Sequence, residues 1–350
     1  MTRKPLTHRA LTLAIAMGAL AFAANTTAEV RTMIVTSDPQ YPWTDRMEEE
    51  PSIPETESER NRRSEELITE QYTSIAAYRA ARPGEDIPVF INGDITAHGH
   101  GWQRSVMARL LPILGDNVHL GLGNHDYKNN VTPEGGYNSA ACYNNGCTRD
   151  SIQDLVRHVT DKAGKVAFDY SANQGVFKTL HQGSLAYATK ARGLDRVLNI
   201  QLNYSPLYEV TFESTEALRV NRYELVSPLP WLRNLLETKL EKPTFGDWKD
   251  REYDFAIIHM HDPDHFDGNF ARLVINADVP AIFAGHLHKD MGLYRTIGSV
   301  PVFLSGSASQ RTYLIVEHDT DEDVLRVYGV RENSPGQKQL IRSVPVHRNR

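Results

Sequence analysis

The feature that most constrains this chain is a pattern that recurs along it: a short apolar strand followed at once by side chains that bind metal ions. Each such segment alone occurs by chance in many proteins, but five in one chain, each after a predicted strand, do not. Polar residues that merely cap strands and turns would not need this many histidines. The five segments are Asp38-Pro39-Gln40, Gly93-Asp94, Gly123-Asn124-His125-Asp126, Ile257-Ile258-His259 and Gly285-His286-Leu287-His288.

Predicted strands and helices alternate through most of the chain. Apolar runs predict strands over 31–37, 89–91, 118–122, 255–258 and 281–284, and helical periodicity predicts helices over 58–82, 102–114, 149–162, 229–242 and 267–277. The pattern also favours short strands between 166 and 212, a loop over 41–57, and strands of a second sheet at 300–304, 313–317 and 324–330. This alternation is typical of an α/β sheet, whose site gathers at the carboxyl ends of its strands.

The five segments resemble the motif pattern of the calcineurin-like metallophosphoesterase superfamily: D-x-H, G-D, G-N-H-D/E, a lone H and G-H-x-H. The matched segments run from Asp38 to His288 and so span most of the chain. The resemblance implies an α/β fold, a four-layer α/β/β/α sandwich of two mixed β-sheets flanked by helices. It also implies a site for two divalent metal ions and hydrolysis of a phosphomonoester or phosphodiester.

The resemblance also implies a role for each matched residue. His125 would face the substrate, stabilising the transition state or protonating the leaving oxygen, and Asp126 would orient His125. The remaining matched side chains would bind metal: Asp38 and His288 the first ion, Asp94 both ions, and Asn124, His259 and His286 the second.

Two of these positions leave alternatives open. Gln40 stands where the family pattern has a histidine; its amide oxygen either coordinates the first ion, as a weaker and harder ligand than imidazole, or takes no part. His261 follows His259 by two residues and would face the same side of a strand, because side chains alternate along a strand. The family position favours His259 as the ligand.

The chemistry of phosphoester hydrolysis explains these residue types. Two cations neutralise the phosphoryl oxygens, clamp an in-line displacement at phosphorus and lower the pKa of the attacking water. Carboxylate, imidazole and amide ligands together suit Mn, Fe, Zn or Mg. The alternative function is an exported binding or virulence-type module that retains the fold with weak or no catalysis. Gln40 would be the first sign of such decay, whereas Asp94 and His125 argue against it.

The N-terminus predicts export. Basic residues near the start precede an apolar run over 10–24, and small residues follow, which is the layout of a signal peptide over 1–28. An uncleaved anchor is the alternative, but the run of 15 residues is shorter than the about 20 that span a membrane. We therefore expect a periplasmic or secreted protein with one domain over 29–350 and no membrane span once the signal is removed.

Charge and cysteine content narrow the partners further. The formal net charge of −6 argues against general nucleic-acid binding, so a phosphoester substrate is the one partner expected. Cys142 and Cys147 lie in an Asn- and Gly-rich segment, about 127–150, whose composition indicates an inserted loop beside the site. In an oxidising compartment they favour a local disulfide over free thiols. The sequence indicates no oligomeric state.

Overall fold

The computed structural model describes residues 29–132, 140–240, 252–277 and 279–346. The predicted signal peptide lies outside these residues.

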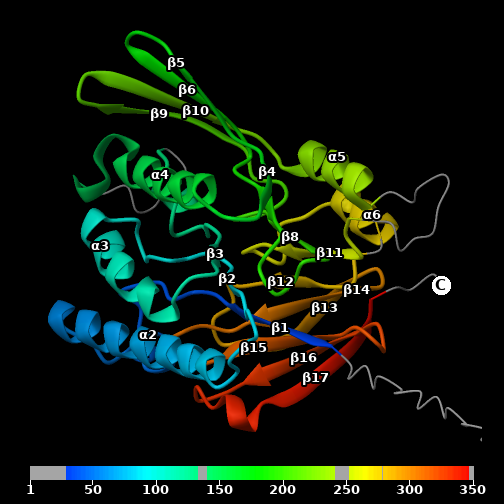
Figure 1. Cartoon of the computed structure of the whole chain (residues 1–350). Helices are drawn as coiled ribbons and strands as arrows, with labels where there is room; N and C mark the ends of the chain where they lie inside the picture. The colour runs from blue at the N-terminus through cyan, green and yellow to red at the C-terminus, as the bar shows by residue number, and fades with distance from the viewer. Residues whose placement is uncertain (1–28, 133–139, 241–251, 278, 347–350) are drawn as a thin grey trace, which may run out of the picture.

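Two mixed sheets form the centre of the molecule (Figure 1). The first has the order β17 (Gln339–Pro345), β16 (Val324–Val330), β15 (Tyr313–Asp319), β1 (Val30–Thr36), β2 (Val89–Ile91) and β3 (Val118–Leu120). The second has the order β13 (Met291–Ile297), β14 (Val300–Ser305), β12 (Ile282–Ala284), β11 (Phe255–His259), β8 (Val197–Gln201), β7 (Tyr187–Thr189) and β4 (Lys165–Phe168).

The two sheets bury their facing sides against each other. Met33 and Phe90 of the first sheet share one apolar cluster with Ile257 and Phe303 of the second. The central strands are covered on both faces, which is why they appear in the sequence as nearly continuous apolar runs.

Helices cover the outer faces of both sheets. Helices α2 (Glu57–Ala80) and α3 (Gly101–Leu110), the latter followed by the 3-10 helix η1 (Leu111–Leu114), pack on the first sheet, and α5 (Leu229–Leu240) and α6 (Gly268–Asn276) pack on the second. Thr56 begins α2 with a capping box to Glu59. The predicted arrangement of two mixed sheets flanked by helices is confirmed.

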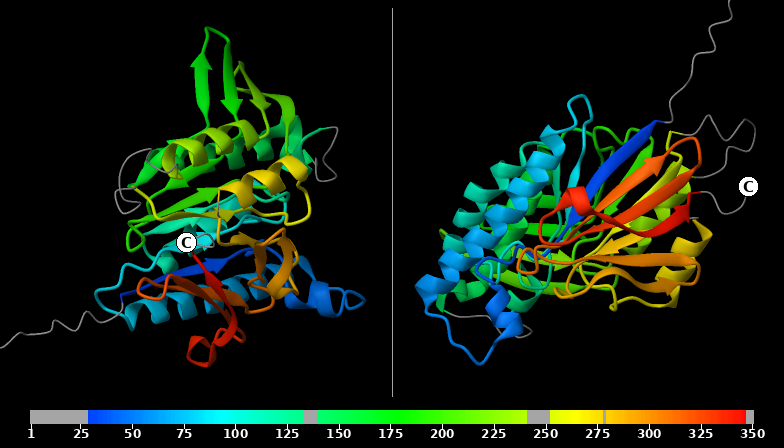
Figure 2. Two further views of the ribbon diagram at one scale, coloured as in Figure 1. Left: turned by 90° about the vertical axis from the view of Figure 1, so that its right-hand side faces the viewer. Right: turned by 90° about the horizontal axis from the view of Figure 1, so that it is seen from below.

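A third sheet was not expected from the sequence. Strands β5 (Ser171–Gln174), β6 (Lys178–Gly183), β10 (Arg219–Leu225) and β9 (Val210–Glu216) form a separate four-stranded sheet that stands out from the sandwich (Figures 1 and 2). Helix α4 (Gly146–Thr160) packs against it through Ile152 and Leu155, which contact the cluster of Phe212 and Tyr223. Short strands were predicted between 166 and 212, but β10 and the assembly into a sheet of their own were not.

Other differences are local. The strands predicted at 300–304, 313–317 and 324–330 do not share one sheet: β14 lies in the second sheet, whereas β15 and β16 lie in the first. Strand β15 pairs with β1, Ile34 opposite Ile315, and local sequence patterns do not encode a pairing between such distant segments. The expected loop over 41–57 contains the short helix α1 (Asp45–Glu49). The inserted segment includes the 3-10 helices η2 (Lys128–Asn130) and η3 (Ala140–Asn145), and α4 begins three residues earlier than predicted.

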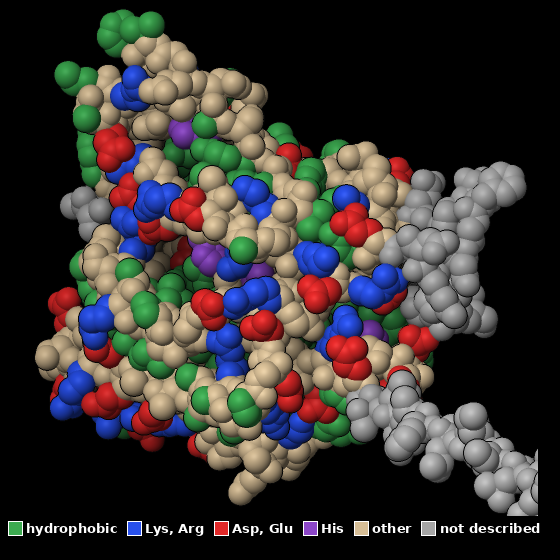
Figure 3. Space-filling model, in the orientation of Figure 1, with side chains coloured by type: hydrophobic (Ala, Val, Ile, Leu, Met, Phe, Trp, Pro, Cys, Tyr) green, Lys and Arg blue, Asp and Glu red, His purple; other side chains and the backbone are tan. Residues whose placement is uncertain are grey.

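Figure 3 shows positive and negative side chains interspersed over one face, with neither sign forming a continuous patch there. Within the described parts of the chain, no helix combines the length and the apolar character needed to cross a bilayer.

The predicted disulfide between Cys142 and Cys147 is confirmed. We expect the double variant Cys142→Ser/Cys147→Ser to lose about 2 kcal/mol of unfolding free energy, because a short closed loop restricts the unfolded chain only modestly. Urea denaturation followed by circular dichroism measures this loss. An unchanged midpoint would contradict the prediction.

Candidate metal centre

The motif segments of both sheets meet at one edge of the sandwich. Strands β1, β2 and β3 are parallel and end on the same side, as do β11 and β12 of the other sheet. Backbone hydrogen bonds join the following loops: Asp38 N–H donates to the Gly93 carbonyl at 3.1 Å, and Gly285 N–H to the His261 carbonyl at 3.0 Å. The loops are therefore held against one another by the backbone itself.

Two groups of potential ligands share one carboxylate. In the first, Asp38, Asp94 and His288 have ligand atoms that all lie within 4.8 Å of one another. The second consists of Asp94, His261 and His286 within the same distance. Asp94 therefore stands between two acid–histidine groups.

The carboxylate oxygens of this centre fit a cation. One oxygen of Asp94 accepts the His125 N–H at 2.9 Å, while Oδ2 lies 3.1 Å from His261 Nε2 without a hydrogen bond. Likewise, Asp38 Oδ1 lies 3.3 Å from His288 Nε2 without one. Both carboxylates are buried, and each of these oxygens faces a histidine nitrogen that could bind the same ion. Metal ions at these two positions would satisfy both oxygens.

His261 takes the place that the sequence assigned to His259. His261 Nδ1 lies 2.8 Å from the Asn92 carbonyl, and Nε2 points to Asn124 Oδ1 at 3.0 Å and to Asp94. His259 is the last residue of β11 and is buried within the sandwich, stacked on Phe90 with the ring centroids 4.2 Å apart. The family-based choice of His259 is corrected to His261, because His259 is packed among core rings.

Gln40 and Asn124 supply amide groups at the same edge. Gln40 N–H donates to the Asp94 carbonyl at 2.8 Å, and its side chain is fully buried. Both polar atoms of the Gln40 amide lack a hydrogen-bond partner among the described residues. A buried amide in this state is suited to coordination, and this favours the reading of Gln40 as a ligand.

Protons and cations compete for the histidines of this centre. Burial lowers the pKa of His261, but Asp94 and Asp38 outweigh burial and raise it to about 9. Burial also lowers the pKa of His288, and the carboxylates of Asp38 and Glu48 raise it to about 10. These pKa values belong to the metal-free protein, and a bound cation would replace the proton on each ligating nitrogen.

A backbone carbonyl orients the ring of His125, a role that the family resemblance assigned to Asp126. His125 Nδ1 lies 2.7 Å from the Ala97 carbonyl. A carbonyl only accepts, so the proton of this bond belongs to Nδ1. The carboxylate of Asp126 accepts the backbone N–H groups of Ile95, Thr96 and Gly123. The predicted role of Asp126 is corrected: it ties the Asp94 loop to the Gly123 loop.

Four residues of the centre have a left-handed backbone conformation. Asp38, Gln40, Asp94 and His286 all have positive φ, between 41° and 75°. Non-glycine residues adopt this region rarely, and such residues cluster at functional sites. Gly123 is required for a different reason, since a Cβ there would lie 2.1 Å from Asp94 Oδ1.

Sequence reasoning missed two neighbours of the centre. Trp43 lies edge-on to both His125 and His288, with ring centroids 5.8 and 5.6 Å away. Glu48, on α1, accepts a hydrogen bond from His288 Nδ1 at 2.7 Å. Both lie in the 41–57 segment, where no motif or periodicity marked them.

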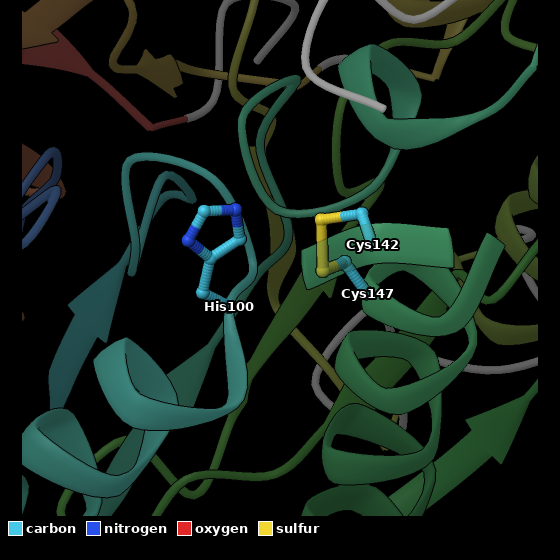
Figure 4. A group of neighbouring side chains, drawn as sticks. All are labelled: His100, Cys142 and Cys147. Atoms are coloured by element: carbon cyan, nitrogen blue, oxygen red, sulfur yellow. A yellow bond between two sulfur atoms is a disulfide. The ribbon is translucent and has the colours of Figure 1, made fainter. Parts of the chain in front are cut away.

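A third group with metal-ligand side chains is a different case. His100 lies beside Cys142 and Cys147 (Figure 4). The two sulfurs are bonded to each other, so neither offers the thiolate that binds metals. His98, whose ring lies 5.4 Å from that of His100 and 6.5 Å from that of His125, connects this disulfide to the edge of the centre.

Comparison with protein families decides the family. A model of the calcineurin-like phosphoesterases matches residues 33–290. The chain belongs to the calcineurin-like phosphoesterase family. All of the residues that form the two acid–histidine groups fall within the matched range, as expected for a metal-dependent phosphoesterase of this family. Curated protein sequences give no match.

Solved structures with a similar arrangement are distant in sequence. Purple acid phosphatase PPD1 from yellow lupin seeds is 10% identical with a TM-score of 0.48, and the alignment covers 90% of this chain and 53% of that one. The protein TT1561 of Thermus thermophilus is 14% identical with a TM-score of 0.41, over 85% and 98% of the two chains. A putative 5'-nucleotidase from Staphylococcus aureus is 13% identical with a TM-score of 0.38, over 92% and 55%.

Proposed function

We propose that this chain hydrolyses phosphoesters with two divalent metal ions that share the carboxylate of Asp94. The observation that carries the proposal is the position of Asp94 in both acid–histidine groups, with one oxygen lacking a hydrogen-bond donor. A site for a single ion would not need a second acid–histidine group that shares the carboxylate of Asp94.

The surrounding side chains divide into two ligand sets. Asp38, Asp94 and His288, joined by the Gln40 amide oxygen, would hold the first ion. The second ion would be held by Asp94 together with Asn124, His261 and His286. Mn, Fe, Zn and Mg all suit these nitrogen and oxygen donors. When bound, the two ions supply charge neutralisation at the phosphoryl group and activation of water.

The protein groups around this centre orient and protonate the substrate. His125 lies beside the centre, because its backbone N–H donates to Asp94 and its ring is held through Nδ1 by the Ala97 carbonyl. It would give a proton to the leaving oxygen or stabilise charge on the phosphoryl oxygens. Trp43, half-buried and edge-on to His125 and His288, would form one wall of the substrate site.

We also propose that the mature protein is exported. The basic and apolar layout of residues 1–28 supports this location, and the Cys142–Cys147 disulfide is compatible with an oxidising compartment. The position of Asp94 in both acid–histidine groups supports catalysis over the alternative, a binding module with weak or no catalysis.

The proposed function is tested by hydrolysis of p-nitrophenyl phosphate and bis-p-nitrophenyl phosphate. We expect turnover of at least one ester with added Mn²⁺ or Zn²⁺, and its loss with EDTA. The ratio of the two rates separates monoester from diester preference. Turnover that persists after complete chelation would contradict the metal-dependent mechanism, and no turnover with any metal would favour the binding module.

The role of Gln40 is testable by Gln40→Glu, which keeps the size of the side chain and replaces the amide by a carboxylate. As a ligand, the carboxylate should tighten binding of the first ion about tenfold, because ligand charge tunes affinity. Isothermal titration of the metal-free protein with Mn²⁺ measures the change. Unchanged affinity together with a lower melting temperature would instead mean that Gln40 is not a ligand.

A further inference from the structure

Three segments of the chain converge on one oxygen of Glu48. Its Oε1 accepts hydrogen bonds from His288 Nδ1 at 2.7 Å, Trp43 Nε1 at 2.9 Å and Ser309 Oγ at 2.8 Å. The side chain is 7% exposed. Glu48 lies outside all five motif segments, so neither the family pattern nor the sequence assigns it a role.

The contact with Glu48 fixes the tautomer of His288. A carboxylate at this distance accepts, so the proton of that bond belongs to Nδ1. The other nitrogen, Nε2, lies 3.3 Å from Asp38 Oδ1 and faces the first ion position. A carboxylate behind a ligating histidine holds the ring and increases its basicity as a ligand.

Glu48 is itself held firmly. Asp45, at the start of the same short helix, forms two bonds with the guanidinium of Arg63 on α2, at 3.2 and 2.6 Å. Lys289 Nζ donates to the Glu48 carbonyl at 2.6 Å. The carboxylate is thus fixed before any ligand arrives.

We propose that Glu48 is a positioning residue of the metal centre: it holds His288 so that Nε2 points at the first ion position beside Asp38. This inference rests on the proposed function, because it gives His288 a role as a metal ligand. It adds a residue to that site that lies on α1 and not at a strand end.

The experiment is isothermal titration calorimetry, in which Mn²⁺ is added to the metal-free protein. We expect Glu48→Ala to bind the first ion about 10- to 100-fold more weakly, the range for loss of a group that supports a ligand. Glu48→Gln should fall between this variant and the wild type, because its amide oxygen still accepts but carries no charge. Glu49→Ala, an exposed neighbour on the same helix, should bind like the wild type.

Ser309→Ala separates positioning from general packing. It removes another donor to Glu48 Oε1 but leaves the bond to His288 in place. A loss of metal affinity in Ser309→Ala as large as that in Glu48→Ala would mean that a local packing defect weakens metal binding, and would overturn the inference. Wild-type affinity in Glu48→Ala, or in Glu48→Gln should the alanine variant not fold, would also overturn it. A wild-type protein that binds no metal would contradict the proposed function as well. If the wild type and the Glu48 variants all bind two ions with equal affinity, only the positioning role of Glu48 is contradicted.

Discussion

Replacing Asp94 by asparagine is expected to lower kcat at least about 100-fold, more than the loss usually caused by removing an outer-shell partner. Asparagine keeps the size of the side chain, and its oxygen can still accept the His125 N–H. The NH₂ group would then take the place of Oδ2, beside His261, where it cannot bind a cation. The variant should therefore fold but fail to hold two ions.

Kinetics with saturating metal, together with the metal content, measure the effect of Asp94→Asn. Asp161→Asn is the matched control, since Asp161 is exposed at the end of α4 and far from the motifs in sequence. The control should keep wild-type kcat. Near-wild-type turnover by Asp94→Asn would show that Asp94 is not shared by two ions.

Replacing His125 by alanine is expected to lower kcat about 10²- to 10⁴-fold, the usual contribution of a positioned proton donor. The metal content should not change, because His125 belongs to neither acid–histidine group. The loss should depend on the leaving group. An alkyl phosphate needs a proton on its departing oxygen, whereas p-nitrophenolate leaves without one.

Comparison of an alkyl phosphate with p-nitrophenyl phosphate therefore tests the role of His125. A much larger loss for the alkyl ester supports proton donation to the leaving oxygen. An equal loss for both esters would assign His125 to stabilisation of the phosphoryl charge. Unchanged kcat for both esters would remove His125 from the reaction.

The sequence predicted those parts of the molecule that local patterns encode. Strand ends such as Asp38, Asp94 and His288 were identified because an apolar run stops at a metal-ligand side chain. The alternation of strands and helices predicted an α/β sheet, and the family resemblance implied two mixed sheets. These features need no knowledge of which distant segments meet.

The sequence-based predictions were wrong where the role of a residue depends on its neighbours in space. His259 and His261 share one side of a strand by parity, but only packing shows that Phe90 covers His259 while His261 reaches Asp94. The family resemblance assigned Asp126 to His125, yet its carboxylate accepts three backbone N–H groups of two loops. Glu48 was not found, since His288 and Ser309, two of its three partners, are 240 and 261 residues away.

The central claim is that two ions flank Asp94, and anomalous diffraction from crystals soaked in Mn²⁺ tests it most directly. We predict two peaks about 3.5–4 Å apart. One should lie between Asp38 and His288, and the other between His261 and His286, with Asp94 touching both. A single peak, or peaks away from Asp94, would contradict the claim.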